Sequence, residues 1–154
     1  MAQAFEFSEM ALKLNEKFNN ARLRGTLLHL HGDHINSWRR HFATGVPILE
    51  QGLRACLEVG DLVYAGHLAF LSVWQAIERG DPLEKVHTLA ARNGNFARQS
   101  HNDAVYQTIQ LEQQFVTSLQ GRTSDLMKFD AAGFDEGASI ATIAKAAFGC
   151  GVVF

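Results

Sequence analysis

The chain has 154 residues, enough for one domain with a hydrophobic core, and 47% of them are hydrophobic, as in an ordinary globular protein. Its formal net charge is −2 and its lysines and arginines are scattered, which argues against nucleic acid or an anionic membrane as partner. The N-terminus lacks the features of a signal peptide, and no run of about 18 apolar residues occurs, so no membrane span is predicted. Cys56 and Cys150 lie in apolar helical patterns; we expect buried thiols and a cytoplasmic protein.

Apolar residues recur at helical spacing along most of the chain, whereas the alternating runs typical of β-strands are missing. Helices are predicted over residues 4–18, 20–36, 44–59 and 62–79. The fourth is apolar around most of its circumference, so we expect it to be buried between neighbouring helices. The first carries one apolar stripe, formed by Phe7, Met10, Ala11, Leu14 and Phe18.

Two of these helices end with the same dipeptide, Gly60-Asp61 and, 20 residues later, Gly80-Asp81. Glycine ends a helix readily because it tolerates positive φ, and aspartate begins the next helix by accepting hydrogen bonds from its free N–H groups. Because Pro82 follows Asp81, we expect Asp81 to be the N-cap of a fifth helix and Pro82 its first residue.

The last third of the chain predicts two more helices. Asn102 is expected to cap the sixth, which ends at Gly121, and residues 121–136 are apolar enough to predict a packed loop. The final helix is predicted over residues 137–154. The chain stops there without a cap or a polar tail, so we expect it to be a fragment of a longer polypeptide.

Short, repeated links make neighbouring helices antiparallel, and a series of them builds stacked helix hairpins. We therefore predict an all-α fold of about seven helices, a tetratricopeptide-like right-handed superhelix forming one domain over residues 1–154. Such stacks bind or position other proteins more often than they catalyse reactions. No catalytic or cofactor-binding residue is predicted.

One string of residues could nevertheless carry chemistry, because residues 29–34 match H-x-H-x-D-H. The string resembles the zinc-binding signature of metallo-β-lactamase-fold hydrolases, and the resemblance implies metal ligands at His29, His31, Asp33 and His34. Three imidazoles and a carboxylate can hold Zn²⁺ and lower the pKa of bound water to about 7. In that fold the motif follows a β-strand, whereas here its surroundings are helical. The alternative, which we prefer, is a helix end at Gly32 with partly exposed histidines and no metal.

Two further groups offer weaker candidates. The basic-aromatic cluster Trp38-Arg39-Arg40-His41 is a possible protein-interaction surface for a phosphate or an acidic peptide, and its alternative role is packing at a helix end. Cys56 with His41 or His67 could form a nucleophile and its base. Because Cys56 lies on an inward stripe, a core thiol is the favoured interpretation.

Most of the chain, from about Arg24 to Phe154, resembles the helical, tetratricopeptide-like middle region of very large bacterial signalling proteins. The best pieces of the match are SWRRHFATGVPILEQGLRACLEVGDLVYAGHLAF and GFDEGASIATIAKAAFGCGVVF. In that family a Ser/Thr protein-kinase domain and an AAA-type ATPase module precede the helical segment, and GAF and histidine-kinase domains follow it. This sequence contains none of the catalytic motifs of those domains.

The resemblance implies a non-catalytic scaffold within a multidomain signalling kinase, with protein as its partner. Two alternatives stay open: a free-standing peptide-binding helical-repeat protein, and a zinc-dependent hydrolase that uses residues 29–34. Because a stack cut from its neighbours exposes an apolar face, we also expect the fragment to self-associate through the 137–154 helix.

Overall fold

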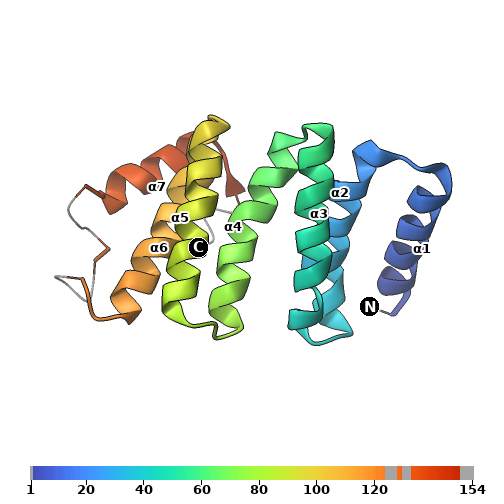
Figure 1. The fold of residues 1–154 in the computed structure, drawn as a ribbon, viewed down its shortest axis with the longest axis horizontal. Helices are drawn as coiled ribbons and strands as arrows, with labels where there is room; N and C mark the ends of the chain where they lie inside the picture. Colours follow the sequence, from blue (N-terminus) through green and yellow to red (C-terminus); the bar gives the residue numbers. More distant parts are fainter. Residues whose placement is uncertain (1, 124–127, 130–132, 150–154) are drawn as a thin grey trace. The chain divides into compact units, whose positions relative to one another are not determined.

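The computed structural model describes residues 2–123, 128–129 and 133–149. All regular structure among these residues is helical and no β-strand forms, which confirms the all-α prediction with seven α-helices (Figure 1). The α-helices are α1 (Ala2–Phe18), α2 (Ala21–His29), α3 (Val46–Val59), α4 (Leu62–Glu78), α5 (Leu83–Gln99), α6 (Asp103–Leu119) and α7 (Glu136–Lys145). Between α2 and α3 lie a π-helix, η1 (Leu30–Ile35), and two 3-10 turns, η2 (Asn36–Trp38) and η3 (Phe42–Thr44).

The chain divides into two compact units, residues 1–75 and 76–154, with the boundary inside α4. In the first unit α2 packs against α3, and α1 contacts α2 and η1; in the second, α6 packs against α5 and α7. Figure 1 shows that α2 and α3 run antiparallel, as do α5 and α6. The two pairs are therefore helix hairpins. A single superhelix over residues 1–154 stays a prediction.

The repeated Gly-Asp dipeptides end helices as predicted. Gly60 and Gly80 adopt left-handed backbone conformations, with φ of 72° and 75°. The N–H of Asp61 donates to the Cys56 carbonyl at 2.9 Å, and the N–H of Asp81 donates to the Ala76 carbonyl at 3.0 Å. These bonds span the same number of residues in both turns and satisfy carbonyls that each helix end would leave free.

The two turns differ in how they begin the next helix. The Asp61 carboxylate accepts a hydrogen bond from the Tyr64 N–H at 3.2 Å, so Asp61 caps α4. At the second turn the prediction was wrong. Pro82 is the N-cap of α5, without a side-chain cap, because the Asp81 carboxylate binds the Arg79 guanidinium instead.

The final helix is shorter than predicted and ends at Lys145. Ala147 adopts a φ of 51°, and the N–H of Phe148 donates to the Ile143 carbonyl at 3.3 Å. This arrangement is a Schellman end formed without glycine, which is why composition did not reveal it. Cys150 and the rest of the predicted helix, residues 150–154, lie outside the described residues.

Each unit has its own apolar core. The first core includes Phe5, Leu28, Leu49, Cys56, Leu68, Phe70 and Val73, and the second includes Val86, Ala90, Ala97, Val105, Ile109, Val116 and Ile143. Cys56 is a buried free thiol, as predicted, and burial raises its pKa to about 11. A thiol that stays protonated at neutral pH does not act as a nucleophile.

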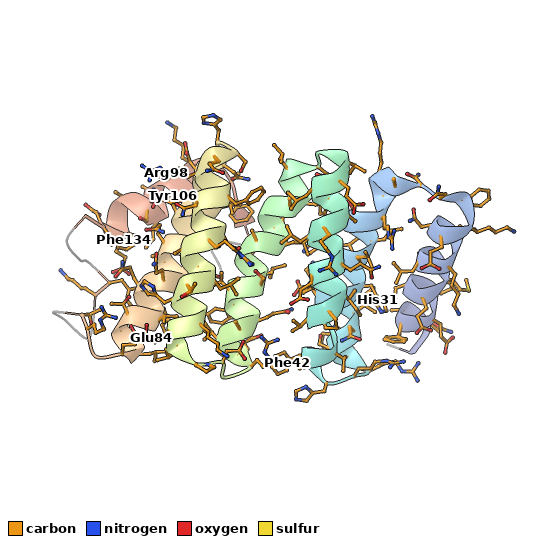
Figure 2. The ribbon with its side chains drawn as sticks, viewed as in Figure 1. His31, Phe42, Glu84, Arg98, Tyr106 and Phe134 are labelled. Carbon is orange, nitrogen blue, oxygen red and sulfur yellow. The ribbon has the colours of Figure 1, made fainter. Side chains whose placement is uncertain are left out.

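Side-chain contacts connect the helices of the second unit. The Arg98 guanidinium lies over the Tyr106 ring, 5.9 Å from its centroid, and joins α5 to α6 (Figure 2). In the predicted packed loop, the Phe129 ring stands edge-on to the Phe115 ring at 6.3 Å, and the Phe129 N–H donates to the Glu136 carboxylate at 3.1 Å. Phe129 of this loop is thus packed, whereas Gly121, Arg122, Lys128 and Gly133 are exposed.

Candidate functional site

The histidine string forms a turn that the sequence did not predict. The helix predicted over residues 20–36 changes from α to π at Leu30, and the Asn36 N–H donates to the His31 carbonyl, five residues back. In this wider turn, residues four and five positions apart lie above one another. His29, Asp33 and His34 therefore share one face. Single π turns are rare and occur often at functional sites.

Glycine allows this turn to pack closely against α3. A Cβ atom on Gly32 would lie 2.9 Å from Leu49 Cδ2, so no other residue fits without displacing that buried side chain. Gly32 is buried inside η1 and does not end a helix. The preferred sequence interpretation of Gly32 as a terminator was wrong, because the chain continues through it as a helix.

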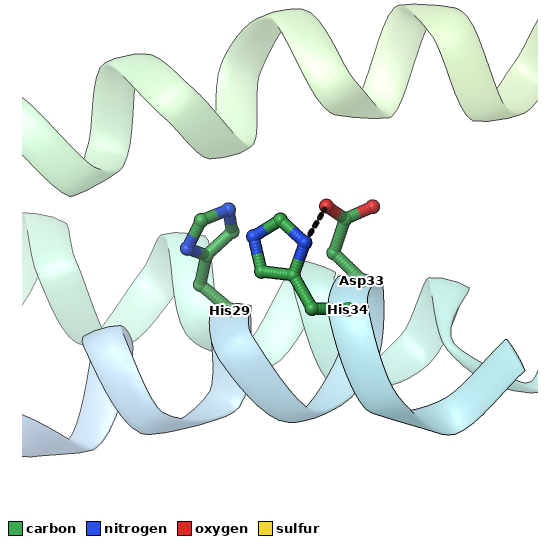
Figure 3. Close-up of side chains that lie close together, drawn as sticks. All are labelled: His29, Asp33 and His34. Carbon is green, nitrogen blue, oxygen red and sulfur yellow. Dashed lines mark ion pairs between the residues drawn. The ribbon is translucent and has the colours of Figure 1, made fainter. Parts of the chain in front are cut away.

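The three side chains on this face lie close together. One possible ligand atom from each of His29, Asp33 and His34 lies within 4.8 Å of the corresponding atoms of the other two. His34 Nδ1 lies 3.4 Å from Asp33 Oδ2, and the His29 and His34 rings lie edge-to-face with centroids 5.4 Å apart. Figure 3 shows the rings of His29 and His34 side by side, with the Asp33 carboxylate beside His34.

Helix α4 supplies aromatic neighbours to this cluster. The His29 ring lies 5.6 Å from the Tyr64 ring and 5.8 Å from the His67 ring, centroid to centroid. Tyr64 and His67 follow the histidine string by thirty residues or more, so the sequence pattern did not connect them with it. Their spacing of three residues on one helix face was the only signal available.

Burial sets the charge of the cluster. His29 is 6% exposed, and its Nδ1 has no hydrogen-bond partner among the described residues. Desolvation, with smaller contributions from His34 and His67, lowers the His29 pKa to about 4. Burial also lowers the pKa of His67 and raises that of Asp33, although the nearby His34 partly opposes the Asp33 shift. His29 and His67 are therefore neutral at pH 7, the form in which imidazole binds metals.

The remaining histidine of the string, His31, belongs to a different contact. Its Nδ1 lies 2.8 Å from Ser8 Oγ, and its ring lies 5.3 Å from the Phe5 ring, both on α1 (Figure 2). The Ser8 hydroxyl donates its proton to the Phe5 carbonyl, so His31 Nδ1 is the donor to Ser8. Of the four predicted ligands, the structure therefore brings together His29, Asp33 and His34, and places His31 apart from them. His31 joins η1 to α1.

The basic-aromatic cluster mainly packs against α1. The guanidinium groups of Arg39 and Arg40 each lie 5.5 Å from the centroid of the buried Phe5 ring, and Arg39 pairs with Glu6 at 3.9 Å. His41 caps η3 by accepting a hydrogen bond from the Ala43 N–H at 3.3 Å.

Trp38 differs from its neighbours, because its side chain is exposed. Arg39, Arg40 and His41 thus have the alternative role considered for this cluster, which is packing at a helix end. A role of this cluster in binding a protein stays a prediction.

A second exposed surface lies on α1. The apolar stripe predicted there exists, but it faces solvent: Phe7 is 66% exposed and Phe18 is 70% exposed. The opposite side of α1 is buried through Phe5 and Asn15. We call the exposed residues the α1 stripe; its members are Phe7, Met10, Leu14 and Phe18.

No protein-family model, curated protein or solved structure matches this chain. None of the helices in the described part of the chain has the length and apolar character needed to cross a bilayer.

Proposed function

We propose that this chain is a non-catalytic helical-repeat scaffold that binds protein helices within a multidomain bacterial signalling kinase in the cytoplasm. The family resemblance of the sequence supports the parent protein, and the helix hairpins support the scaffold. The α1 stripe is the observation that carries the protein-binding part of the proposal.

The α1 stripe is a stable surface because α1 is held from its other side. Phe5 is buried against His31 and against the guanidinium groups of the two arginines that follow η2, and Ser8 is bonded to His31. A large exposed apolar surface on a well-packed helix marks an interaction site.

The spacing of the stripe favours another helix as occupant. Its four members follow one another by three, four and four residues, which produces a ridge that packs into the groove of a facing helix. Exposed charged residues, including Lys13 and Lys17, lie beside it, as at the edge of an amphipathic helix pair. The occupant is therefore an amphipathic helix of a protein partner.

Sedimentation velocity of the isolated chain tests this proposal, because α1 of a second copy is then the available amphipathic helix. We expect the chain to self-associate and the double variant Phe7→Glu, Leu14→Glu to be monomeric. Lys13→Glu, which changes the net charge by the same amount beside the stripe, is the control and should still associate.

A variant on α7 separates this contact from the one predicted at residues 137–154. Ile140 is exposed on α7, and Ile140→Glu should leave the association unchanged. A monomeric wild-type chain, or an association lost in Ile140→Glu and kept in the double variant, would overturn the role of the α1 stripe.

The mass of the native protein tests the remainder of the proposal. A polypeptide much larger than 17.0 kDa in the source cells would agree with a multidomain kinase. A native polypeptide of about that mass would support the free-standing peptide-binding protein instead.

A further inference from the structure

We propose that His29, Asp33 and His34 form a binding site for one divalent transition-metal cation of the Zn²⁺ type. Two imidazoles and one carboxylate are a donor set that such ions accept, and it differs from the all-oxygen sets preferred by Mg²⁺ and Ca²⁺. The inference is independent of the scaffold proposal, since it concerns another face of the first unit.

The distances suit a site that closes around the ion. Tetrahedral coordination with metal–ligand bonds of about 2.1 Å places ligand atoms about 3.4 Å apart. The His34–Asp33 pair already has this separation, at 3.4 Å, and the other pairs are within 4.8 Å. The His34 side chain is 57% exposed, so it can rotate the remaining distance at little cost.

The buried member of the cluster, His29, presents one ring nitrogen to its neighbours. Figure 3 shows that Nε2 of His29 is the ring nitrogen nearer to His34, whereas Nδ1, which has no hydrogen-bond partner among the described residues, lies on the far side of the ring. A bound cation would compensate the burial of His29 and of the half-buried Asp33 carboxylate together. It would also leave at least one coordination position for water, since the chain supplies three ligands.

The π turn gives the site its geometry. An α-helix aligns residues three and four positions apart, whereas η1 brings position 29 together with both 33 and 34. Gly32 fixes the turn against α3, so the ligands stand on a packed element and not on a loop. His31 points to α1 and is not a ligand.

Titration calorimetry with Zn²⁺ on the chelator-treated full chain tests the assignment. We expect one Zn²⁺ per chain, and an affinity reduced at least about tenfold in His34→Ala and in Asp33→Asn. Zn²⁺ should also raise the melting temperature of the wild-type chain and leave that of His34→Ala unchanged.

Two histidine controls make the result specific. His101→Asn removes an exposed histidine from the second unit, where asparagine tolerates the positive φ of 55°, and should bind Zn²⁺ as the wild type does. His31→Gln should also keep the wild-type affinity. No Zn²⁺ binding, equal affinities of wild type and His34→Ala, or an equal loss in folded His31→Gln would overturn the three-residue site.

Discussion

The two helix hairpins, α2–α3 in the first unit and α5–α6 in the second, are both antiparallel but bury polar groups differently. In the first, His29 is buried beside two other possible ligands, one of them exposed. In the second, Glu112 on α6 is 3% exposed, and neither of its carboxylate oxygens has a hydrogen-bond partner among the described residues.

Burial alone therefore does not identify a ligand site. It shifts both groups towards their neutral forms, lowering the pKa of His29 to about 4 and raising that of Glu112 well above its usual range. Only His29 has neighbours that could share an ion and a route to solvent. Glu112 instead resembles an isolated acid that stays protonated inside the core.

The hairpins also differ in how closely their helices approach. A Cβ on Gly25 of α2 would overlap Cys56 Sγ and lie 3.1 Å from the Cys56 backbone nitrogen, whereas a Cβ on Gly94 of α5 would have its nearest neighbour at 3.5 Å, an ordinary contact. The close packing of α2 against α3 thus requires glycine at position 25, whereas the packing of α5 against α6 does not require glycine at position 94.

Gly25→Ala should have the largest effect on stability. We expect a loss of about 3 kcal/mol in the free energy of unfolding, because the added methyl group separates α2 from α3. Gly94→Ala, also in a helix, should instead raise it by up to about 1 kcal/mol through helix propensity. Urea unfolding curves of both variants test the contrast, which fails if both changes have the same sign.

Glu112→Gln should have the next largest effect. The raised pKa means that the folded chain holds this proton at pH values where the unfolded chain has released it. The contribution of Glu112 therefore lowers stability as the pH rises from about 4.5 towards the folded pKa. We expect Glu112→Gln to be more stable than the wild type by about 1–2 kcal/mol at pH 8 and by less at pH 5.

Unfolding curves at the two pH values measure this difference. Glu78→Gln removes an exposed carboxylate from the end of α4 and should show no such pH-dependent gain. An equal gain at pH 5 and pH 8 would mean that Glu112 is not protonated in the core.

The smallest expected difference in stability is between variants of the two Gly-Asp turns. Asp61 accepts a bond from a free helix N–H, so Asp61→Ala should lower the free energy of unfolding by about 1 kcal/mol. Asp81 caps nothing and binds an exposed arginine, so Asp81→Ala should cost less than about 0.5 kcal/mol. Thermal unfolding of Asp61→Ala and Asp81→Ala measures the two losses in stability. Equal losses would contradict the observed difference in capping.

The sequence was most informative about helix ends that use glycine. Gly60, Gly80 and Gly121 end their helices as predicted, since each adopts a positive φ that other residues avoid. The helix end at Ala147 was not predicted, because alanine adopts a positive φ only with steric strain that glycine does not have. Asp61 and Asp81 were likewise predicted to be equivalent, because a competing arginine two residues away from Asp81 is visible only as a contact.

The candidate site was harder to predict than the fold. The three ligand residues stand in one string, but an α-helical period does not place all of them together, and the π turn that does so has no sequence signature. Likewise, the α1 stripe was correctly found, whereas its exposure depends on Phe5, whose ring packs under His31 and Arg39. Orientation follows from tertiary contacts that spacing does not reveal.

The π turn at η1 has a consequence for how the site could be gained or lost. A helix that contains one wider turn is an α-helix with one surplus residue in its register. Deleting one residue from this segment would let a regular α-helix re-form. A deletion between His29 and Asp33 would leave the three side chains three and four positions apart, the spacings that a regular helix aligns, and would keep them together. A deletion after His34 would keep the five-residue spacing and rotate the ring of His34 away from that of His29, so the site depends on where the surplus residue lies as well as on residue identity.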